Sequence, residues 1–561
     1  MAKTTGAKAL ANMFKGYGIT HVFYVPQVAS VALVEMEDLG ITRVVAHSEK
    51  GAAYMADGFA RAKGTPAVCA AQPIGASNLA SGLRDAYMAH TPLIAISGGP
   101  MPVSRYRYAY QEVEDFSQFD SVTKANYNVD TVGRLPDMVR QAFRDATTGC
   151  PGPVHLRFQG RRSDAPLGEG DIDEVVETQF ASVPPFRPEP EPHAVKAGIA
   201  ALVEARRPII VAGGGVAHSR AQAEVVALAE LLQIPVATSL NGKGTILENH
   251  PLSVGVVGTY SRECTNRAVH EADLVFYIGS PAGGMVTGNW TVPGFGATVM
   301  QLDIEANELG RNFPNKVALL GDAKATLTKM IAEAQGKKVD RKAWTDRVQE
   351  LCKTWRDAFA SKMASNDLPI RPERLCKDLE AVLPDDAIIV SDTGHAGMWT
   401  SQMIELTKPG QRYIRCAGSL GWGIPGAMGV KVAMPDRPVI CFTGDGGAYY
   451  HLPELETALR YGINLVIVVN NNGALSQELP HLTMNYGGKL RGNSDQMWKF
   501  RQDFNFAKVA EAMGCGGIRV EKPEDIQGAI KQALAMNKPV VVEVITDVNL
   551  MAPMAWVPPK A

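Results

Sequence analysis

Short apolar runs alternate with helical patterns along the first third of the chain. The runs expected to form buried strands are residues 21–25, 66–71, 92–97 and 154–158. Helical patterns cover residues 6–17 and 50–61. Strands separated by helices are typical of βαβ units in a parallel sheet, so we expect a doubly wound α/β domain over residues 1–165.

The same alternation returns twice farther along the chain. The expected strands are 208–211, 235–238 and 274–278 in a second unit, and 388–390, 439–443, 465–469 and 540–545 in a third. Acidic, proline-rich sequence at 166–192 cannot hold a helix or a central strand, and charged helical sequence covers 336–368. We read these two segments as linkers. The prediction is three doubly wound parallel-sheet domains, 1–165, 193–335 (Rossmann-like) and 369–561, of which the first and third could share one fold.

The charge balance is close to neutral, with 56 Lys and Arg against 58 Asp and Glu among 561 residues. No overall field therefore favours nucleic acid or an anionic membrane surface. No apolar run reaches the length of a bilayer span, and the first residues contain no uninterrupted apolar core of a signal peptide. The eight cysteines form no C-x-x-C pair. We expect a cytoplasmic protein with a small-molecule substrate, and neither a nucleic acid nor a membrane as partner.

Polar clusters follow two consecutive strands of the third unit. Gly444, Asp445, Gly446 and Gly447 come directly after the strand 439–443, and Asn472 closely follows the strand 465–469. The carboxyl ends of parallel strands share one edge of a sheet, where ligands bind. Carboxylate and amide oxygens suit Mg²⁺, and glycines before a helix N-terminus suit a phosphate. Each cluster alone would be an ordinary βα turn.

Together these clusters resemble the thiamine diphosphate fingerprint, and nearly the whole chain resembles the acetolactate synthase-like branch of thiamine diphosphate enzymes. That branch includes 2-oxo acid decarboxylases, carboligases and 2-hydroxyacyl-CoA lyases. The resemblance implies pyrimidine-binding, central and diphosphate-binding domains in that order. It also implies that Gly444, Gly446 and Gly447 contact the diphosphate. The implied Mg²⁺ ligands are the side chains of Asp445 and Asn472 and the backbone carbonyl of Ala474.

Glu49 stands between a strand and a helix rich in small residues, and this stretch is similar to the family's pyrimidine-domain motif. By that resemblance Glu49 is the catalytic acid that hydrogen-bonds the aminopyrimidine ring of the cofactor. The family chemistry needs a carboxyl group able to share a proton there. On its own, Glu49 would instead be a first-turn acid that complements the helix dipole.

Further site residues follow from the same resemblance. Leu420 matches the bulky apolar residue that supports the bent cofactor, although a core leucine would look the same. Gln111 is a candidate catalytic residue on the substrate side, and His395 is another because it can exchange protons near neutral pH. The remaining cofactor-binding candidates are Pro26, Gly75, Asn78, Thr393 and Gly394.

Two segments depart from the family pattern on the substrate side. Relatives often have Pro-Gly where this chain has Pro26 and Gln27, and Ser-Gly-Pro-Gly where it has the segment 71–75, which includes Gln72. Side chains in place of glycines change the volume and polarity of a pocket, so a pyruvate preference is in doubt. The glycine-rich strand ends of the central unit form no full dinucleotide fingerprint. The segment 280–285 lacks the Arg and Asp of flavin-binding relatives, so bound FAD is not expected.

The leading hypothesis is a thiamine diphosphate- and Mg²⁺-dependent lyase or transferase that breaks or forms a C–C bond on a 2-oxo acid, as a decarboxylase or carboligase. A 2-hydroxyacyl-CoA lyase or an oxalyl-CoA decarboxylase-like enzyme is the second hypothesis, although the segment 552–561 offers CoA phosphates only Lys560. A non-catalytic protein that keeps the fold is the third. The family pattern implies a homodimer as the smallest assembly and a homotetramer as the expected one.

Overall fold

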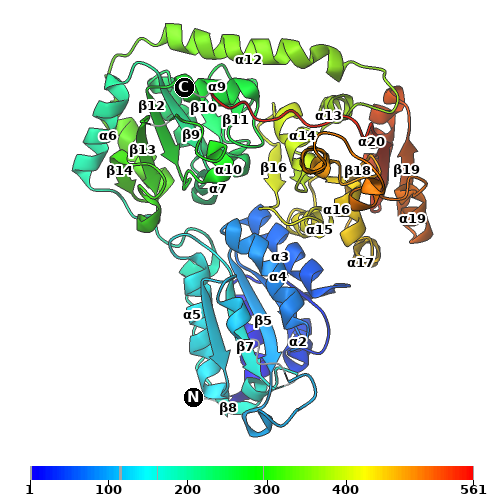
Figure 1. Cartoon of the computed structure of the whole chain (residues 1–561). Coiled ribbons are helices and arrows are strands. Elements are labelled where there is room, and N and C mark those ends of the chain that lie inside the picture. The colour runs from blue at the N-terminus through cyan, green and yellow to red at the C-terminus, as the bar shows by residue number, and fades with distance from the viewer. Residues whose placement is uncertain (1–2, 113–115, 161, 295, 560–561) are drawn as a thin grey trace.

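The computed structural model describes residues 3–112, 116–160, 162–294 and 296–559, so Lys560 lies outside the described part. Within this part, three six-stranded sheets covered by helices form three units (Figure 1). All the strand pairs inside the six-stranded sheets are parallel. The predicted three-unit α/β fold is confirmed, while the domain boundaries stay predictions.

The first unit contains a sheet with the strand order β3-β2-β4-β5-β7-β6. Its strands are β2 (His21–Tyr24), β3 (Thr42–Val45), β4 (Ala67–Ala71), β5 (Leu93–Gly99), β6 (Ala125–Val129) and β7 (Val154–Gln159). Its helices are α1 (Gly6–Gly16), α2 (Ser30–Asp38), α3 (Glu49–Lys63), α4 (Ala76–Met88) and α5 (Leu135–Thr147). Local sequence explains the ends of α3. The Ser48 side chain caps the N–H of Gly51, and Gly64 ends the helix with a left-handed backbone.

The central unit contains a sheet with the order β11-β10-β9-β12-β13-β14. Its strands are β9 (Pro208–Ala212), β10 (Val236–Thr238), β11 (Ser253–Val256), β12 (Leu274–Ile278), β13 (Thr298–Asp303) and β14 (Asn315–Leu320). Its helices are α6 (Pro192–Glu204), α7 (Gly214–Ser219), α8 (Gln222–Leu231), α9 (Glu263–Glu271), α10 (Gly284–Thr287) and α11 (Ala323–Ala334). Counted along the chain, this is the 3-2-1-4-5-6 order of a Rossmann fold.

The third unit contains a sheet with the order β16-β15-β17-β18-β20-β19. Its strands are β15 (Ile388–Ser391), β16 (Arg412–Arg415), β17 (Val439–Gly444), β18 (Val466–Asn471), β19 (Gly516–Val520) and β20 (Val540–Ile545). Its helices are α13 (Pro372–Ala381), α14 (His395–Met403), α15 (Gly423–Ala433), α16 (Asp445–Tyr450), α17 (Glu454–Arg460), α18 (Leu479–Asn485), α19 (Phe506–Ala512) and α20 (Ile526–Ala535). Counted along the chain, the first and third sheets both have the order 2-1-3-4-6-5, as expected for one shared fold.

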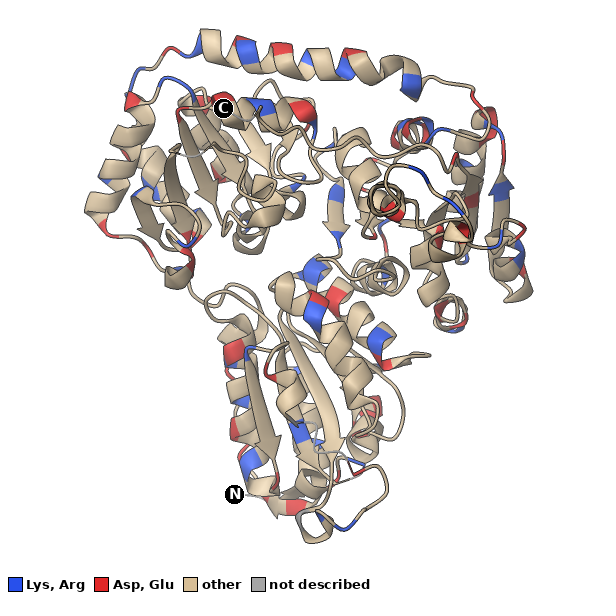
Figure 2. Ribbon diagram, in the orientation of Figure 1, with Lys and Arg blue, Asp and Glu red and all other residues tan. Residues whose placement is uncertain are grey.

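Two connecting segments differ in character. The segment predicted as the first linker contains the short strand β8 (Glu169–Asp171), which pairs antiparallel with β1 (Lys3–Thr5) and fastens the beginning of the described chain. The second connection contains the long helix α12 (Lys342–Met363), which runs along the outside toward the third unit (Figure 1). Acidic and basic side chains are interspersed along α12 (Figure 2), as on a helix face exposed to solvent.

A buried ionic network within the first unit binds the third unit through hydrogen bonds. Helix α3 packs against α15, and Arg61 of α3 donates to Asp57 (2.6 Å) and to Asp85 (2.8 Å). Trp422, just before α15, donates its indole N–H to Asp57 at 2.8 Å. Removing one partner from such a buried network typically costs about 3–5 kcal/mol, because it leaves an uncompensated charge. The first and third units are therefore fixed firmly to each other.

No helix among the described residues is both long enough and apolar enough to cross a membrane.

Candidate functional site

The strand order of the third sheet brings two candidate loops together. Strands β15 and β17 are neighbours at the point where the order along the sheet reverses, and their register aligns Ser391 with Phe442. Thr393 and Gly394 follow β15, and Gly444 ends β17. Open α/β sheets bind ligands at the carboxyl ends of the strands beside such a reversal. The topology therefore places the predicted loops at a ligand-binding edge.

Asp445 opens α16 at this edge, and only 4% of it is exposed. One carboxylate oxygen accepts from the N–H of Gly446 at 2.6 Å. The other accepts from the N–H groups of Asn472 (3.2 Å) and Ala474 (3.0 Å). The ends of β17 and β18 are thus held against each other through Asp445. Burial raises the pKa of this carboxyl group to about 6, although the backbone donors act in the opposite direction.

The donor set around Asp445 suits a hard cation. Asn472 donates its amide N–H to Ser476 Oγ at 2.9 Å, so its carbonyl oxygen is not used in that bond. This oxygen, the Asp445 carboxylate and the Ala474 carbonyl are hard oxygen donors of the kind that Mg²⁺ prefers. In the described part of the chain, no group of three or more His, Cys, Asp or Glu side chains could hold a metal. Asp445, Asn472 and Ala474 therefore fit magnesium better than a metal that prefers nitrogen or sulfur.

The glycines of this turn differ in what surrounds them. A methyl group at Gly444 would meet nothing within 4 Å, whereas one at Gly446 would lie 2.6 Å from the Leu475 side chain. One at Gly447 would lie 2.7 Å from a carboxylate oxygen of Asp392. Gly446 and Gly447 are therefore required by packing, and Gly444 lies beside open space at the edge.

Asp392 is a site residue that the sequence analysis missed. Its buried carboxylate accepts from the N–H groups of Thr393 (2.8 Å), Gly421 (3.2 Å) and Gly423 (3.1 Å), and from the Thr443 hydroxyl (3.0 Å). One side chain thus holds the loop after β15, the loop before α15 and the end of β17. Burial raises its pKa to about 6. Its position next to the predicted Thr393 was the only sequence signal.

His395 begins α14 at the same edge. Its Nδ1 lies 3.0 Å from Ser476 Oγ, the atom that also accepts from Asn472, so Ser476 joins the loops after β15 and β18. Burial lowers the pKa of His395 to about 4, so the imidazole is neutral near pH 7. The preceding Gly394 has φ +68°, which favours glycine. Leu420 is half-buried in the loop that Asp392 fixes.

A second cluster forms at the carboxyl edge of the first sheet, where Glu49 begins α3. Asn78 of α4 donates to Glu49 Oε2 at 3.2 Å, and a methyl group at Gly75 would lie 2.4 Å from Glu49 Oε1. Glu49, Gly75 and Asn78 therefore belong to one cluster. Pro26 lies exposed in the loop after β2. Because β2 and β4 are neighbouring parallel strands, Pro26 lies on the same edge of the sheet as Gly75, in a different loop.

The third unit supplies a buried acid to the base of α3. Glu454 of α17 is 1% exposed, and it accepts from the N–H of His47 (3.1 Å) and from the Thr457 hydroxyl (2.9 Å). Burial raises its pKa. Glu454 thus fixes the chain two residues before Glu49. Sequence reasoning missed it because the two segments are far apart along the chain.

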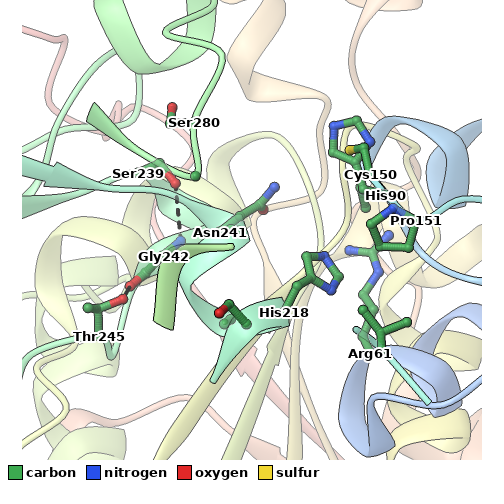
Figure 3. A pocket seen from close by; sticks show the side chains of 18 of the residues that line it. Arg61, His90, Cys150, Pro151, His218, Ser239, Asn241, Gly242, Thr245 and Ser280 are labelled. Atoms are coloured by element: carbon green, nitrogen blue, oxygen red, sulfur yellow. Dashed lines mark hydrogen bonds between the residues drawn. The ribbon is translucent and has the colours of Figure 1, made fainter. Parts of the chain in front are cut away.

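A cavity of about 760 Å³ lies where the three units meet (Figure 3). The central unit lines it with glycine-rich strand ends, and the first unit adds His90 and Cys150. His218 of α7 also faces it, with its pKa lowered to about 4 by burial. Its lining includes none of the candidate residues in the two clusters described above, so it is a separate cavity.

Comparisons with known proteins account for most of the chain. Residues 4–119 match the family model described as the N-terminal TPP binding domain of thiamine pyrophosphate enzymes. Residues 195–330 match the central domain, and residues 392–544 the C-terminal TPP binding domain. Thiamine pyrophosphate is another name for thiamine diphosphate.

Several relatives align over nearly their full length. A probable acetolactate synthase large subunit of Methanocaldococcus jannaschii is 33% identical over 99% of this chain and 93% of its own length. An acetolactate synthase of Arthrospira platensis is 30% identical over 97% and 94%. A glyoxylate carboligase of Escherichia coli O157:H7 is 30% identical over 98% and 94%.

Proposed function

Because the chain belongs to the acetolactate synthase-like family of thiamine diphosphate enzymes, we propose that it breaks or forms a carbon–carbon bond next to the carbonyl group of a 2-oxo acid. The observation that carries this proposal is the buried carboxylate of Asp445, bound to the N–H groups of Asn472 and Ala474 at the reversal of the third sheet. A buried carboxylate beside further oxygen ligands suits a cation that in turn binds a diphosphate.

The third unit would hold the metal and the diphosphate. Asp445, Asn472 and the carbonyl of Ala474 are the proposed Mg²⁺ ligands, and the turn at Gly444 leaves room for the phosphate groups. Asp392 fixes the neighbouring loops. Leu420 would support the organic part of the cofactor. When bound, thiamine diphosphate supplies an electron sink for the bond that breaks beside the carbonyl group.

The first unit would control protons. Glu49 is proposed to share a proton with the aminopyrimidine ring, and Asn78 orients its carboxyl group by the hydrogen bond already described. His395 is neutral near pH 7, so it would offer substrate a hydrogen bond without adding a positive charge. Gln111 is the proposed substrate contact on this side.

A second copy of the chain completes the site in this proposal. The described contacts of the Glu49 carboxyl group come from its own unit, through Asn78 and Gly75. Large apolar side chains are exposed in the loops at this edge, including Ile74 and Tyr108, the latter 99% exposed. Exposed apolar groups near a site favour a protein partner. We therefore propose that Glu49 of one copy serves the diphosphate edge of another, in a dimer or a dimer of dimers.

Flavin is not part of the proposed site. The segment 280–285 at the central cavity contains neither Arg nor Asp, and the strand ends beside it are glycine turns. We propose that catalysis proceeds without bound FAD.

The test uses the purified full chain with thiamine diphosphate and Mg²⁺. Pyruvate, glyoxylate and an acyl-CoA are supplied in turn, CO₂ release is followed, and the products are identified by mass spectrometry. Glu49→Gln should lower kcat about 100-fold or more while cofactor affinity changes little, because proton transfer typically contributes that much. Asp445→Asn should weaken Mg²⁺-dependent cofactor binding. Glu521→Gln, an exposed acid beside Arg519, is the matched control.

Mixing the Glu49→Gln and Asp445→Asn chains tests the shared site. Mixed dimers would contain one site without either substitution, so activity should return to a substantial fraction of the wild-type value after subunit exchange. Full activity in both single variants would overturn the assigned roles. Cleavage of the acyl-CoA without reaction of either 2-oxo acid would overturn the substrate class, and failure of the mixture to recover activity would overturn the shared site.

A further inference from the structure

Two glutamine side chains meet beside the Glu49 cluster. Gln72 follows the last residue of β4, three positions before Gly75, which lies against Glu49. Gln111 reaches this place from the loop after β5. It donates its amide N–H to Gln72 Oε1 at 3.2 Å. The pair therefore lies at the same sheet edge as the proposed catalytic acid.

The side-chain oxygen of Gln111 has no hydrogen-bond partner among the described residues. This Oε1 atom is also buried. The backbone of Gln111 is unusual too, with φ +59°, a left-handed conformation that a residue with a side chain rarely adopts. Residues held in such conformations cluster at functional sites. A buried acceptor on a strained loop beside a catalytic edge is placed to receive a hydrogen bond from a ligand.

We propose that Gln72 is a specificity-determining residue that selects 2-oxo acids with a hydroxyl group next to the carbonyl over those with only a methyl group. Gln72 acts through Gln111. By accepting the Gln111 N–H it turns the Gln111 oxygen toward the substrate, where a hydroxyl group can donate to it. A methyl group cannot donate, so it leaves the buried oxygen unpaired. This inference rests on the proposed function and specifies its substrate class.

The side chain at position 72 determines whether Gln111 presents its oxygen or its N–H group to the substrate. A carboxylate can only accept, so Gln72→Glu must keep the N–H of Gln111 and leave its oxygen free. An ammonium group can only donate, so Gln72→Lys should capture the Gln111 oxygen and offer the substrate an N–H. Gln72→Leu removes the hydrogen bond, and the Gln111 amide can then rotate. The three variants thus separate a directed hydrogen bond from simple packing.

The test measures kcat/KM for hydroxypyruvate and for pyruvate, two monoanions that differ by one hydroxyl group. The wild-type chain should favour hydroxypyruvate, and Gln72→Glu should keep this ratio even if both KM values rise through charge repulsion. The ratio should fall about tenfold in Gln72→Leu and at least as far in Gln72→Lys, and tenfold corresponds to about 1.4 kcal/mol. Gln527→Leu is the matched control, because the Gln527 amide also makes one hydrogen bond, which it donates to Asp378 in the third unit.

Each outcome has a distinct meaning. A fall in the ratio for Gln72→Leu and Gln72→Lys, with the ratio preserved in Gln72→Glu and Gln527→Leu, supports the inference. A wild-type chain that accepts both acids equally overturns it, and so does a ratio that the Leu and Lys variants keep, while the proposed function stands. A wild-type chain that reacts with neither acid, nor with any other 2-oxo acid, overturns the proposed function together with this inference.

Discussion

Asp392→Asn tests whether one buried carboxylate organises the loops of the third sheet. In the wild-type chain one oxygen of Asp392 accepts from Thr393 and Gly421, and the other from Gly423 and Thr443. An amide keeps one accepting oxygen and replaces the other by an N–H₂ group. The Thr443 hydroxyl can rotate and accept from that group, but the N–H of Gly423 cannot. The substitution therefore leaves one buried N–H without an acceptor.

Asp392→Asn should affect two quantities, the free energy of unfolding of the apo chain and the affinity for the cofactor. A buried donor without a partner costs about 1–3 kcal/mol. The raised pKa of Asp392, about 6 against 3.8, means that its ionised form loses about 3 kcal/mol on folding, and the amide removes this loss. The two effects nearly cancel in the free energy of unfolding of the apo chain at pH 7. Because the Gly423 N–H loses its acceptor, we expect the loop with Gly421 and Gly423 to shift. This shift should weaken cofactor binding about tenfold or more.

The stability of the wild-type chain should change with pH in a defined direction. The folded pKa of Asp392 lies above the unfolded one, so its contribution to stability is complete below about pH 4 and is lost as the pH rises through about 6. Between about pH 5 and pH 7, urea unfolding of the wild-type apo chain should lose about 1 kcal/mol relative to Asp392→Asn. Cofactor affinity is measured by quenching of tryptophan fluorescence with Mg²⁺ present. Unchanged affinity in Asp392→Asn, or a stability difference that grows with pH in favour of the wild type, would refute the reasoning.

Substitutions at two further positions, Gly75 and Glu454, test the cluster around Glu49. Gly75→Ala should lower kcat about tenfold or more, because the new methyl group would lie 2.4 Å from Glu49 Oε1, while the melting temperature changes little since φ at Gly75 is −74°. Gly133→Ala, where nothing lies within 4 Å, is its control, and equal kcat values in the two variants would contradict the contact. Glu454→Gln should unfold in urea within about 1 kcal/mol of the wild type, because one oxygen still accepts the His47 N–H, whereas Glu454→Ala should cost about 2 kcal/mol. A large loss in Glu454→Gln would show that the charge itself is required.

The sequence predicted the strands in the interiors of the sheets far better than those at the edges. Strands β9, β12 and β20 are buried along their lengths and read as continuous apolar runs. Seven strands of the three sheets went unpredicted. Six of them, β3, β6, β11, β14, β16 and β19, lie at sheet edges, and only β13 lies in an interior. At the edges polar residues interrupt the apolar pattern, as in the Arg-Tyr-Ile-Arg sequence of β16.

Some residues of the candidate site could likewise be predicted from the sequence, and others could not. Residues next to strand ends could be placed because the parallel topology gathers those ends, and the structure indeed joins Asp445 to the Asn472 loop. Asp392, Ser476 and Glu454 could not be placed, because each acts through contacts between segments that only the folded chain brings together. Hydrogen bonds of that kind leave no periodic signal in the sequence.

The packing of the first unit against the third bears on the proposal that a second copy of the chain completes the Glu49 cluster. Helices α3 and α15 occupy equivalent places in the two units, after the second strand and before the third, and they pack closely at glycines. A methyl group at Gly58 would meet the Gly426 carbonyl, and one at Gly429 the Met55 carbonyl, so the helices run antiparallel. Trp422, at the start of α15, accordingly lies against Arg61 near the end of α3. Glu49 begins α3 about 18 Å away along its axis, at 1.5 Å per residue. Glu49 thus lies at the end of α3 opposite to Arg61, and its described contacts, to Asn78 and Gly75, stay within the first unit. This favours the proposed second copy of the chain as the source of the diphosphate edge.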